Sequence, residues 1–149
     1  MAYQSRADLS NTPLILSDES DVENHDLIQD EERTTDLLFG TVMAQIAASG
    51  LWTPFISVVG VDGSGVPRGI YLGDDIVAAD LVAENIVDVP ILVGNARVNE
   101  SEVVWDDDTL DADTVVAPAT VEARTARRAL EESVNIRLEA TVRTTAHEN

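Results

Sequence analysis

The sequence predicts an α+β fold that is mostly β: a small, compact β-rich domain with one late helix, preceded by an extended acidic arm. Short segments of alternating apolar and polar residues recur between turns rich in Gly, Asp and Pro. A helical pattern follows late in the chain, and the first residues combine many acids with little hydrophobicity. We therefore divide the chain into an N-terminal arm, residues 1–35, and a β-rich domain, residues 36–149.

The strongest strand signal lies in residues 90–105. Alternation with a period of two is typical of a strand that has one buried and one solvated face. Asn95, Arg97 and Asn99 take the solvated positions, and Pro90 suits the start of a strand because it has no N–H to donate. We expect a buried face made of Leu92, Gly94, Ala96 and Val98.

Shorter strands are expected before this stretch. Residues 41–46 and 51–55 flank a Ser-Gly turn and predict a hairpin. Pro54 makes the second of these an edge strand or a bulged strand. The pattern then predicts a turn, a short strand, and either a turn of helix or an irregular loop, in residues 60–65, 66–72 and 73–85 respectively.

A single helix and a final strand follow the central stretch. Thr120 is the expected N-cap of a helix over residues 120–133, and Glu122 suits its first turn. Alternation in residues 136–142 predicts the closing strand, with its apolar members facing inward: Ile136, Leu138, Ala140 and Val142.

The expected arm carries nine acids against two arginines. Low hydrophobicity with high net charge predicts disorder in isolation, because too little apolar surface can be buried to offset the chain entropy. Two apolar clusters interrupt the arm, at residues 14–16 and 27–28. They are either scattered residues of a tail or short anchors that become ordered on a partner.

The charge is extreme, with 28 acids against 9 arginines, a formal net charge of −19 and no lysine. Such a surface repels nucleic acid and anionic membranes, so we expect no direct partner of either kind. The acid excess indicates adaptation to high salt, where screening removes the cost of self-repulsion. The alternative is a GC-rich genome that encodes basic residues as Arg, although this alone does not explain the excess.

The sequence offers little for catalysis or metal binding. There are no cysteines, no apolar run of about 20 residues and no signal peptide, so we expect a soluble protein made without secretion. His25 and His147 lie in expected tails, and no catalytic motif is present, so we expect neither an enzyme nor a cofactor. A carboxylate-only active site stays open. Residues 106–113 form either a solvated acidic loop, which we favour, or a Ca²⁺ site.

Trp52 and Trp105 end or interrupt expected strands. Their default role is to fill the core, because each side chain buries a large apolar area. The alternative is that one of them lies between subunits, where tryptophan is enriched.

Several turn and strand motifs resemble those of lambda-type head decoration proteins of tailed phages and archaeal tailed viruses. The first of them are Gly40-Thr41-Val42 and the segment from Gly50 to Pro54-Phe55. Asp62-Gly63-Ser64, the segment from Val66 to Gly69-Ile70, and Leu92 to Val98 follow in the same order as in that family. The resemblance covers about residues 37–143, and its motifs are structural rather than catalytic.

The resemblance implies a structural virion protein that forms homotrimers on the outer surface of the capsid. There it would bind the major capsid protein and stabilise the shell against the pressure of packed DNA, after synthesis in the host cytoplasm. The arm would become ordered on the capsid protein. The residues we expect to contact the capsid are Leu14, Ile15, Leu16, Trp52, Pro54 and Phe55. The alternative is a free-standing binding or assembly module of a halophile that is not part of a virion.

Overall fold

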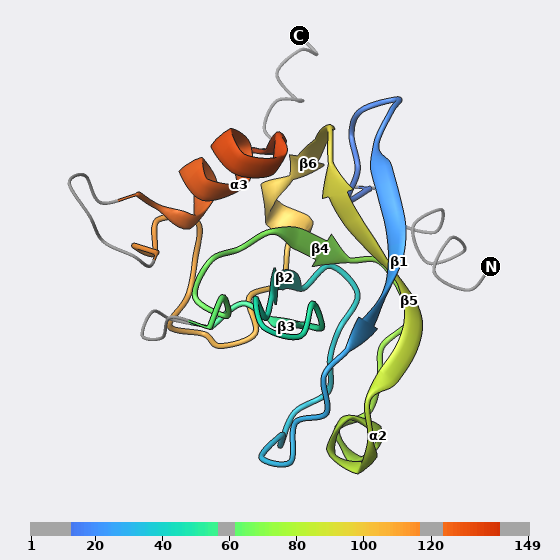
Figure 1. Cartoon of the computed structure of the whole chain (residues 1–149). Helices are drawn as coiled ribbons and strands as arrows, with labels where there is room; N and C mark the ends of the chain where they lie inside the picture. Colours follow the sequence, from blue (N-terminus) through green and yellow to red (C-terminus); the bar gives the residue numbers. More distant parts are fainter. Residues whose placement is uncertain (1–12, 57–61, 117–123, 141–149) are drawn as a thin grey trace, which may run out of the picture.

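The computed structural model describes residues 13–56, 62–116 and 124–140 and has two layers (Figure 1). The first layer is a closed barrel in which neighbouring strands follow the order β1-β3-β2-β4-β5. Its strands are β1 (Asp21–Leu27), β2 (Val42–Gln45), β3 (Trp52–Pro54), β4 (Gly69–Tyr71) and β5 (Ile86–Gly94).

The second layer is a parallel pair of strands beside a helix. It consists of β6 (Ala96–Asn99), β7 (Ile136–Glu139) and α3 (Ala126–Val134), with a 3-10 turn η1 (Glu100–Glu102) after β6. A short helix, α2 (Ala78–Ala83), lies at the opposite end of the molecule from α3 (Figure 1). This arrangement confirms the predicted class, α+β and mostly β. In the described part of the chain no helix is long and apolar enough to span a membrane.

Alternation along the barrel strands builds two separate cores. One set of side chains points into the barrel, where Met43, Tyr71 and Ile91 pack with Leu27 and Trp52. Their neighbours on the same strands point the other way, against α3 and the β6–β7 pair. These outward apolar residues are Val42, Ala44, Ile70 and Leu92. Each barrel strand therefore joins the two layers, because successive side chains of a strand face opposite sides.

The central stretch has the predicted alternation through Val98, but it belongs to two strands. Two expectations for it are wrong: Asn99 is buried, with 2% exposed, and Pro90 lies inside β5 and not at the start of a strand. The predicted face, Leu92, Gly94, Ala96 and Val98, is buried. Asn95 has a positive φ of 51°, which ends β5 and turns the chain into β6. Asn tolerates this left-handed conformation better than most residues, because its short side chain bonds locally. The alternation therefore continues across a change of sheet.

The predicted hairpin is confirmed, with β2 antiparallel to β3 and Gln45 opposite Trp52. β3 also pairs with β1, but only at Trp52. Pro54 lies two residues further along β3 and has no partner on β1. In the predicted turn after β3, Gly63 has a φ of 103°, and a Cβ there would lie 2.2 Å from the Gln45 carbonyl oxygen. Glycine is thus required at this turn.

Hydrogen bonds from Ser64 to the Asp62 carboxylate lower the pKa of Asp62.

The expected boundary at residue 35 does not appear in the structure. β1 pairs antiparallel with β5 along most of its length, and Leu14 is only 3% exposed in the core between the layers. Residues 13–35 are therefore part of the fold and not an arm outside it, while residues 1–12 lie outside the described ranges. The acids of β1 stay solvated while its backbone pairs, so low hydrophobicity did not prevent strand formation.

The late helix starts later than predicted. Residues 124–125 are not helical, and the Thr125 side chain accepts a hydrogen bond from Arg128 N, so Thr125 is the N-cap of α3. The expected cap, Thr120, lies outside the described residues. α2 shows that segment 73–85 contains a helix, so α3 is not the single helix. The final strand is confirmed as β7 through Glu139, with Ile136 and Leu138 buried as predicted. Ala140, also predicted to face inward, is exposed, and Val142 lies outside the described residues.

Candidate binding site at the open end of the barrel

An open hollow of about 370 Å³ lies where β1 separates from β3. These two strands pair only at Leu27 and Trp52, and the residues of β1 before Leu27 pair with β5 alone. The seam between β1 and β3 is therefore open above Trp52. The hollow is lined by Glu23 and His25 of β1, Gln45, Trp52, Arg68, Val93 and Val134.

Trp52 lines this hollow, and its side chain also fills part of the barrel interior. Only 4% of its surface is exposed. The ring lies so close to Gly69 that a Cβ at this glycine would be 3.1 Å from Trp52 Cζ3 and 2.7 Å from the Leu92 carbonyl oxygen. The His25 ring packs on Trp52 with centroids 5.1 Å apart and a tilt of 34°. The position of the indole is thus fixed by glycine on one strand and histidine on another.

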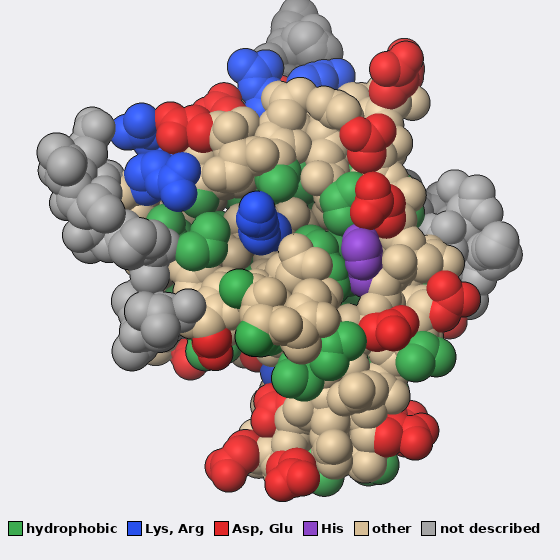
Figure 2. Space-filling model, in the orientation of Figure 1, with side chains coloured by type: hydrophobic (Ala, Val, Ile, Leu, Met, Phe, Trp, Pro, Cys, Tyr) green, Lys and Arg blue, Asp and Glu red, His purple; other side chains and the backbone are tan. Residues whose placement is uncertain are grey.

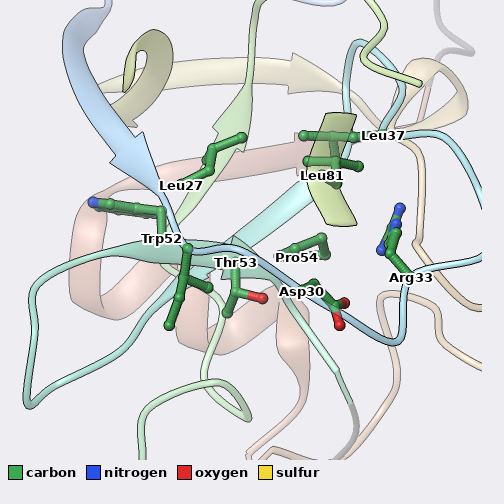
Figure 3. A pocket seen from close by; sticks show the side chains of 9 residues that line it. Leu27, Asp30, Arg33, Leu37, Trp52, Thr53, Pro54 and Leu81 are labelled. Atoms are coloured by element: carbon green, nitrogen blue, oxygen red, sulfur yellow. The ribbon is translucent and has the colours of Figure 1, made fainter. Parts of the chain in front are cut away.

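The indole N–H of Trp52 is buried and has no hydrogen-bond acceptor among the described residues. A buried donor without an acceptor costs about 1–3 kcal/mol. In Figure 3 the indole nitrogen lies at the end of the ring that points away from a second, enclosed cavity. The donor is therefore a place at which an incoming acceptor would be stabilised.

Arg68 contributes the positive charge of the hollow. Its backbone N–H donates to the Met43 carbonyl oxygen at 2.8 Å, which holds it beside β2, and its side chain is exposed. Within the described part of the chain, Arg68 is the one arginine that forms no ion pair with a carboxylate. The others pair as Arg33–Asp106, Arg97–Glu139, Arg124–Glu132, Arg127–Glu100, Arg128–Glu132 and Arg137–Glu131.

The carboxylate in the hollow, Glu23, is engaged by His25, with Glu23 Oε1 at 2.9 Å from His25 Nε2. The hollow therefore combines an unpaired guanidinium, a buried donor and apolar walls from Val93 and Val134. This chemistry suits a group that carries negative charge and hydrogen-bond acceptors.

The second cavity also borders Trp52, is more enclosed than the hollow and has a volume of about 10 Å³ (Figure 3). That is room for about one water molecule. Arg33, at its wall, donates to both Asp106 carboxylate oxygens at 2.6 Å and to the carbonyl oxygens of Thr35 and Asp36. This side of Trp52 is therefore packed and internally paired. Each of the two cavities has a single carboxylate in its lining, Asp30 here and Glu23 in the hollow.

The residues predicted to contact a capsid do not form one exposed surface. Leu14, Trp52 and Phe55 are 3%, 4% and 0% exposed, and Ile15, Leu16 and Pro54 are partly buried. Leu14 and Phe55 belong to the core between the layers, whereas Trp52 belongs to the barrel interior. Of the six, Trp52 alone lines the hollow. The apolar cluster at 14–16 thus packs onto its own chain, beside β6.

Both tryptophans contribute to packing as expected. Phe55 and the partly buried Trp105 meet edge to face, with centroids 6.2 Å apart. The alternative that one tryptophan lies between subunits stays a prediction.

The acidic loop over residues 106–113 is organised by its own turns. Thr109 donates two hydrogen bonds to the Asp107 carboxylate, which lower the pKa of Asp107. Leu110 and Ala112 point into the core between the layers. In the described ranges no group of three or more His, Cys, Asp or Glu residues is placed to hold a metal ion.

Charge is unevenly distributed over the surface. Figure 2 shows arginines gathered over α3 and acids along β1 and around the end that carries α2. Sequence reasoning did not find the hollow, because its residues come from several separate segments. One signal was present: Arg68 has no acid within five positions on either side, in a chain with 28 acids.

No protein-family model matches the sequence, and no curated protein matches it significantly. The resemblance to decoration proteins therefore rests on the motif residues themselves.

Proposed function

We propose that the protein is a capsid decoration protein, a structural component that binds the outer surface of a tailed-virus head as trimers and stabilises the shell. The observation that carries this proposal is the position of the motif residues. Gly63 and Gly69, within two of the motifs shared with decoration proteins, lie where a Cβ would collide with the backbone of β2 or β5. The resemblance thus involves residues on which the barrel itself depends.

The architecture also suits a cementing role. Two cores share the same strands, so the barrel strands are packed on both faces, as a cementing protein requires of a stable body. A protein that binds the assembled shell and not its broken state stabilises the shell by mass action. Many weak contacts repeated over a shell add through multivalency.

A free-standing binding or assembly module of a halophile is the alternative function. The net charge of −19 without lysine supports the halophilic part of either proposal, and the hollow beside Trp52 would serve a soluble partner equally well. The two proposals differ in whether the protein stabilises a particle.

The test compares heads that carry the protein with heads that lack it. We expect the bare heads to assemble but to release DNA at a lower temperature than decorated heads. During stepwise dilution into lower salt, the bare heads should release DNA earlier, while the salt concentration is still higher. Adding back the purified full chain should restore the release temperature, which is followed with a DNA-binding dye. Equal release temperatures for bare and decorated heads would contradict the cementing role.

A further inference from the structure

We propose that the hollow at the open end of the barrel receives a carboxylate side chain from a second copy of this chain, with Arg68 as its main anchor. This inference rests on the trimer of the proposed function and names the contact that holds it together. It follows from the pairing of the arginines, the chemistry of Trp52 and the shape of the hollow.

The pairing of the arginines makes Arg68 the available cation. In a chain with 28 acids, the other arginines of the described part are already bound to carboxylates of the same chain. The Arg68 guanidinium, in contrast, lines a hollow whose one carboxylate, Glu23, is bound to His25. Guanidinium binds carboxylate through two parallel N–H···O bonds, which gives both strength and direction.

Trp52 supplies the second recognition feature. A carboxylate has lone pairs beyond those that bind one guanidinium, and the indole N–H of Trp52 is a buried donor without an acceptor in the described chain. The His25 ring packs against this indole, so Trp52 and His25 together form one wall of the hollow. Tryptophan and arginine at the centre of a hollow with apolar walls are typical of residues that dominate the energy of a protein interface.

The shape and the charge indicate a second copy as the occupant. An open hollow cannot surround a small molecule, so the ligand must be held by the surface from which it projects. The chain itself displays many carboxylates, as the acids along β1 show (Figure 2). When each copy donates one carboxylate and receives one, the contacts are head to tail and three of them close a ring.

The experiment measures self-association of the full chain by sedimentation equilibrium in molar KCl. We expect the natural chain to form trimers, and Arg68→Gln to associate roughly thirtyfold more weakly, as for an interface hot spot. Arg97→Gln is the matched control, because Arg97 is also exposed but pairs with Glu139 outside the hollow. It should associate like the natural chain. Unfolding midpoints of both variants identify any loss that is due to misfolding.

A spectroscopic readout tests the site directly. The indole N–H resonance of Trp52, assigned with Trp105→Phe, should shift with protein concentration in the natural chain and stay fixed in Arg68→Gln. N-acetylglutamate serves as the free carboxylate probe and should compete with association.

Three results would overturn the proposal: Arg68→Gln that associates normally, a natural chain that stays monomeric, or a probe that shifts the indole resonance without any self-association. Attachment to heads is measured in parallel. If Arg68→Gln forms trimers and decorates heads, the hollow is wrong and decoration stands. If trimers depend on Arg68 but never bind heads, the hollow is right and decoration is wrong.

Discussion

The two sides of Trp52 use arginine in opposite ways. On the enclosed side, the Arg33 side chain is 7% exposed and binds both oxygens of Asp106. On the open side, Arg68 is exposed and has no carboxylate partner in the described chain. One arginine stabilises the fold, and the other is available to a partner.

The difference shows that an abundance of acids does not by itself pair every arginine. Arg33 meets Asp106 because the loop after η1 returns to the segment that follows β1. Arg68 has no acid within five positions on either side in the sequence, and the carboxylate across the hollow is bound to His25. Placement by the fold decides which arginine is structural.

The largest expected effect comes from removing β1, which supplies residues to both sides of Trp52. Deleting residues 1–30 should abolish the cooperative unfolding transition, because β5 loses its partner and the barrel opens. Deleting residues 1–12 is the control, since every described contact is kept. Circular dichroism during a thermal melt checks both. A normal transition after the longer deletion would show that β1 is dispensable.

The second prediction sets the two arginines against each other. Arg33→Gln should lower the free energy of unfolding by about 3 kcal/mol, because it leaves the Asp106 carboxylate without its partner at a mostly buried site. Arg68→Gln should change it by less than about 0.5 kcal/mol, as for an exposed side chain without an ion pair. Urea unfolding of the two variants measures both values. Equal losses would mean that the two sides of Trp52 do not differ as described.

The third prediction concerns the close packing of Gly69 against the Trp52 ring and the backbone of β5. Gly69→Ala should cost about 2 kcal/mol, because the new Cβ would lie 2.7 Å from the Leu92 carbonyl oxygen and 3.1 Å from the Trp52 ring. Displacement of the ring into the hollow should also shift its fluorescence to longer wavelength. A variant with an unchanged unfolding midpoint and emission maximum would rule out this close approach.

The smallest expected effect is a difference in salt dependence. Raising KCl from low to molar concentration should increase the unfolding midpoint of the natural chain, because screening weakens repulsion within a net charge of −19. The penalty of Arg33→Gln should stay within about 0.5 kcal/mol over the same range, because buried pairs are screened little. A midpoint that falls or stays flat with salt would remove the case for a halophilic origin.

Much of the fold could be predicted because the pattern is local. The alternation of residues 90–98, the hairpin of β2 and β3, and β7 all carry their own signal of period two. β1 could not be predicted, because most of its side chains are polar and exposed and its stability comes from pairing with a strand 59 to 73 residues further along the chain. Leu14, which precedes β1, is recognisable as apolar in the sequence, but its burial becomes evident only in the folded structure.

The candidate site was predicted only in part. Trp52 was predicted to contact a capsid because Pro54 marks its strand as an edge, and the structure places it in the lining of the hollow. Arg68 entered only as a member of a motif, and His25 was assigned to a tail. Their proximity depends on β1 closing the barrel beside β3, which no local pattern encodes.

The central claim is that this protein belongs to a virus particle, and the most direct measurement is its sedimentation from the native source. A lysate is separated on a density gradient in molar salt, and the chain is detected in each fraction with a specific antibody. The account predicts that the chain sediments with particles the size of a virus head and moves to the light fractions when the heads are dissociated. A chain found only in the light fractions of a lysate that contains intact heads would contradict it.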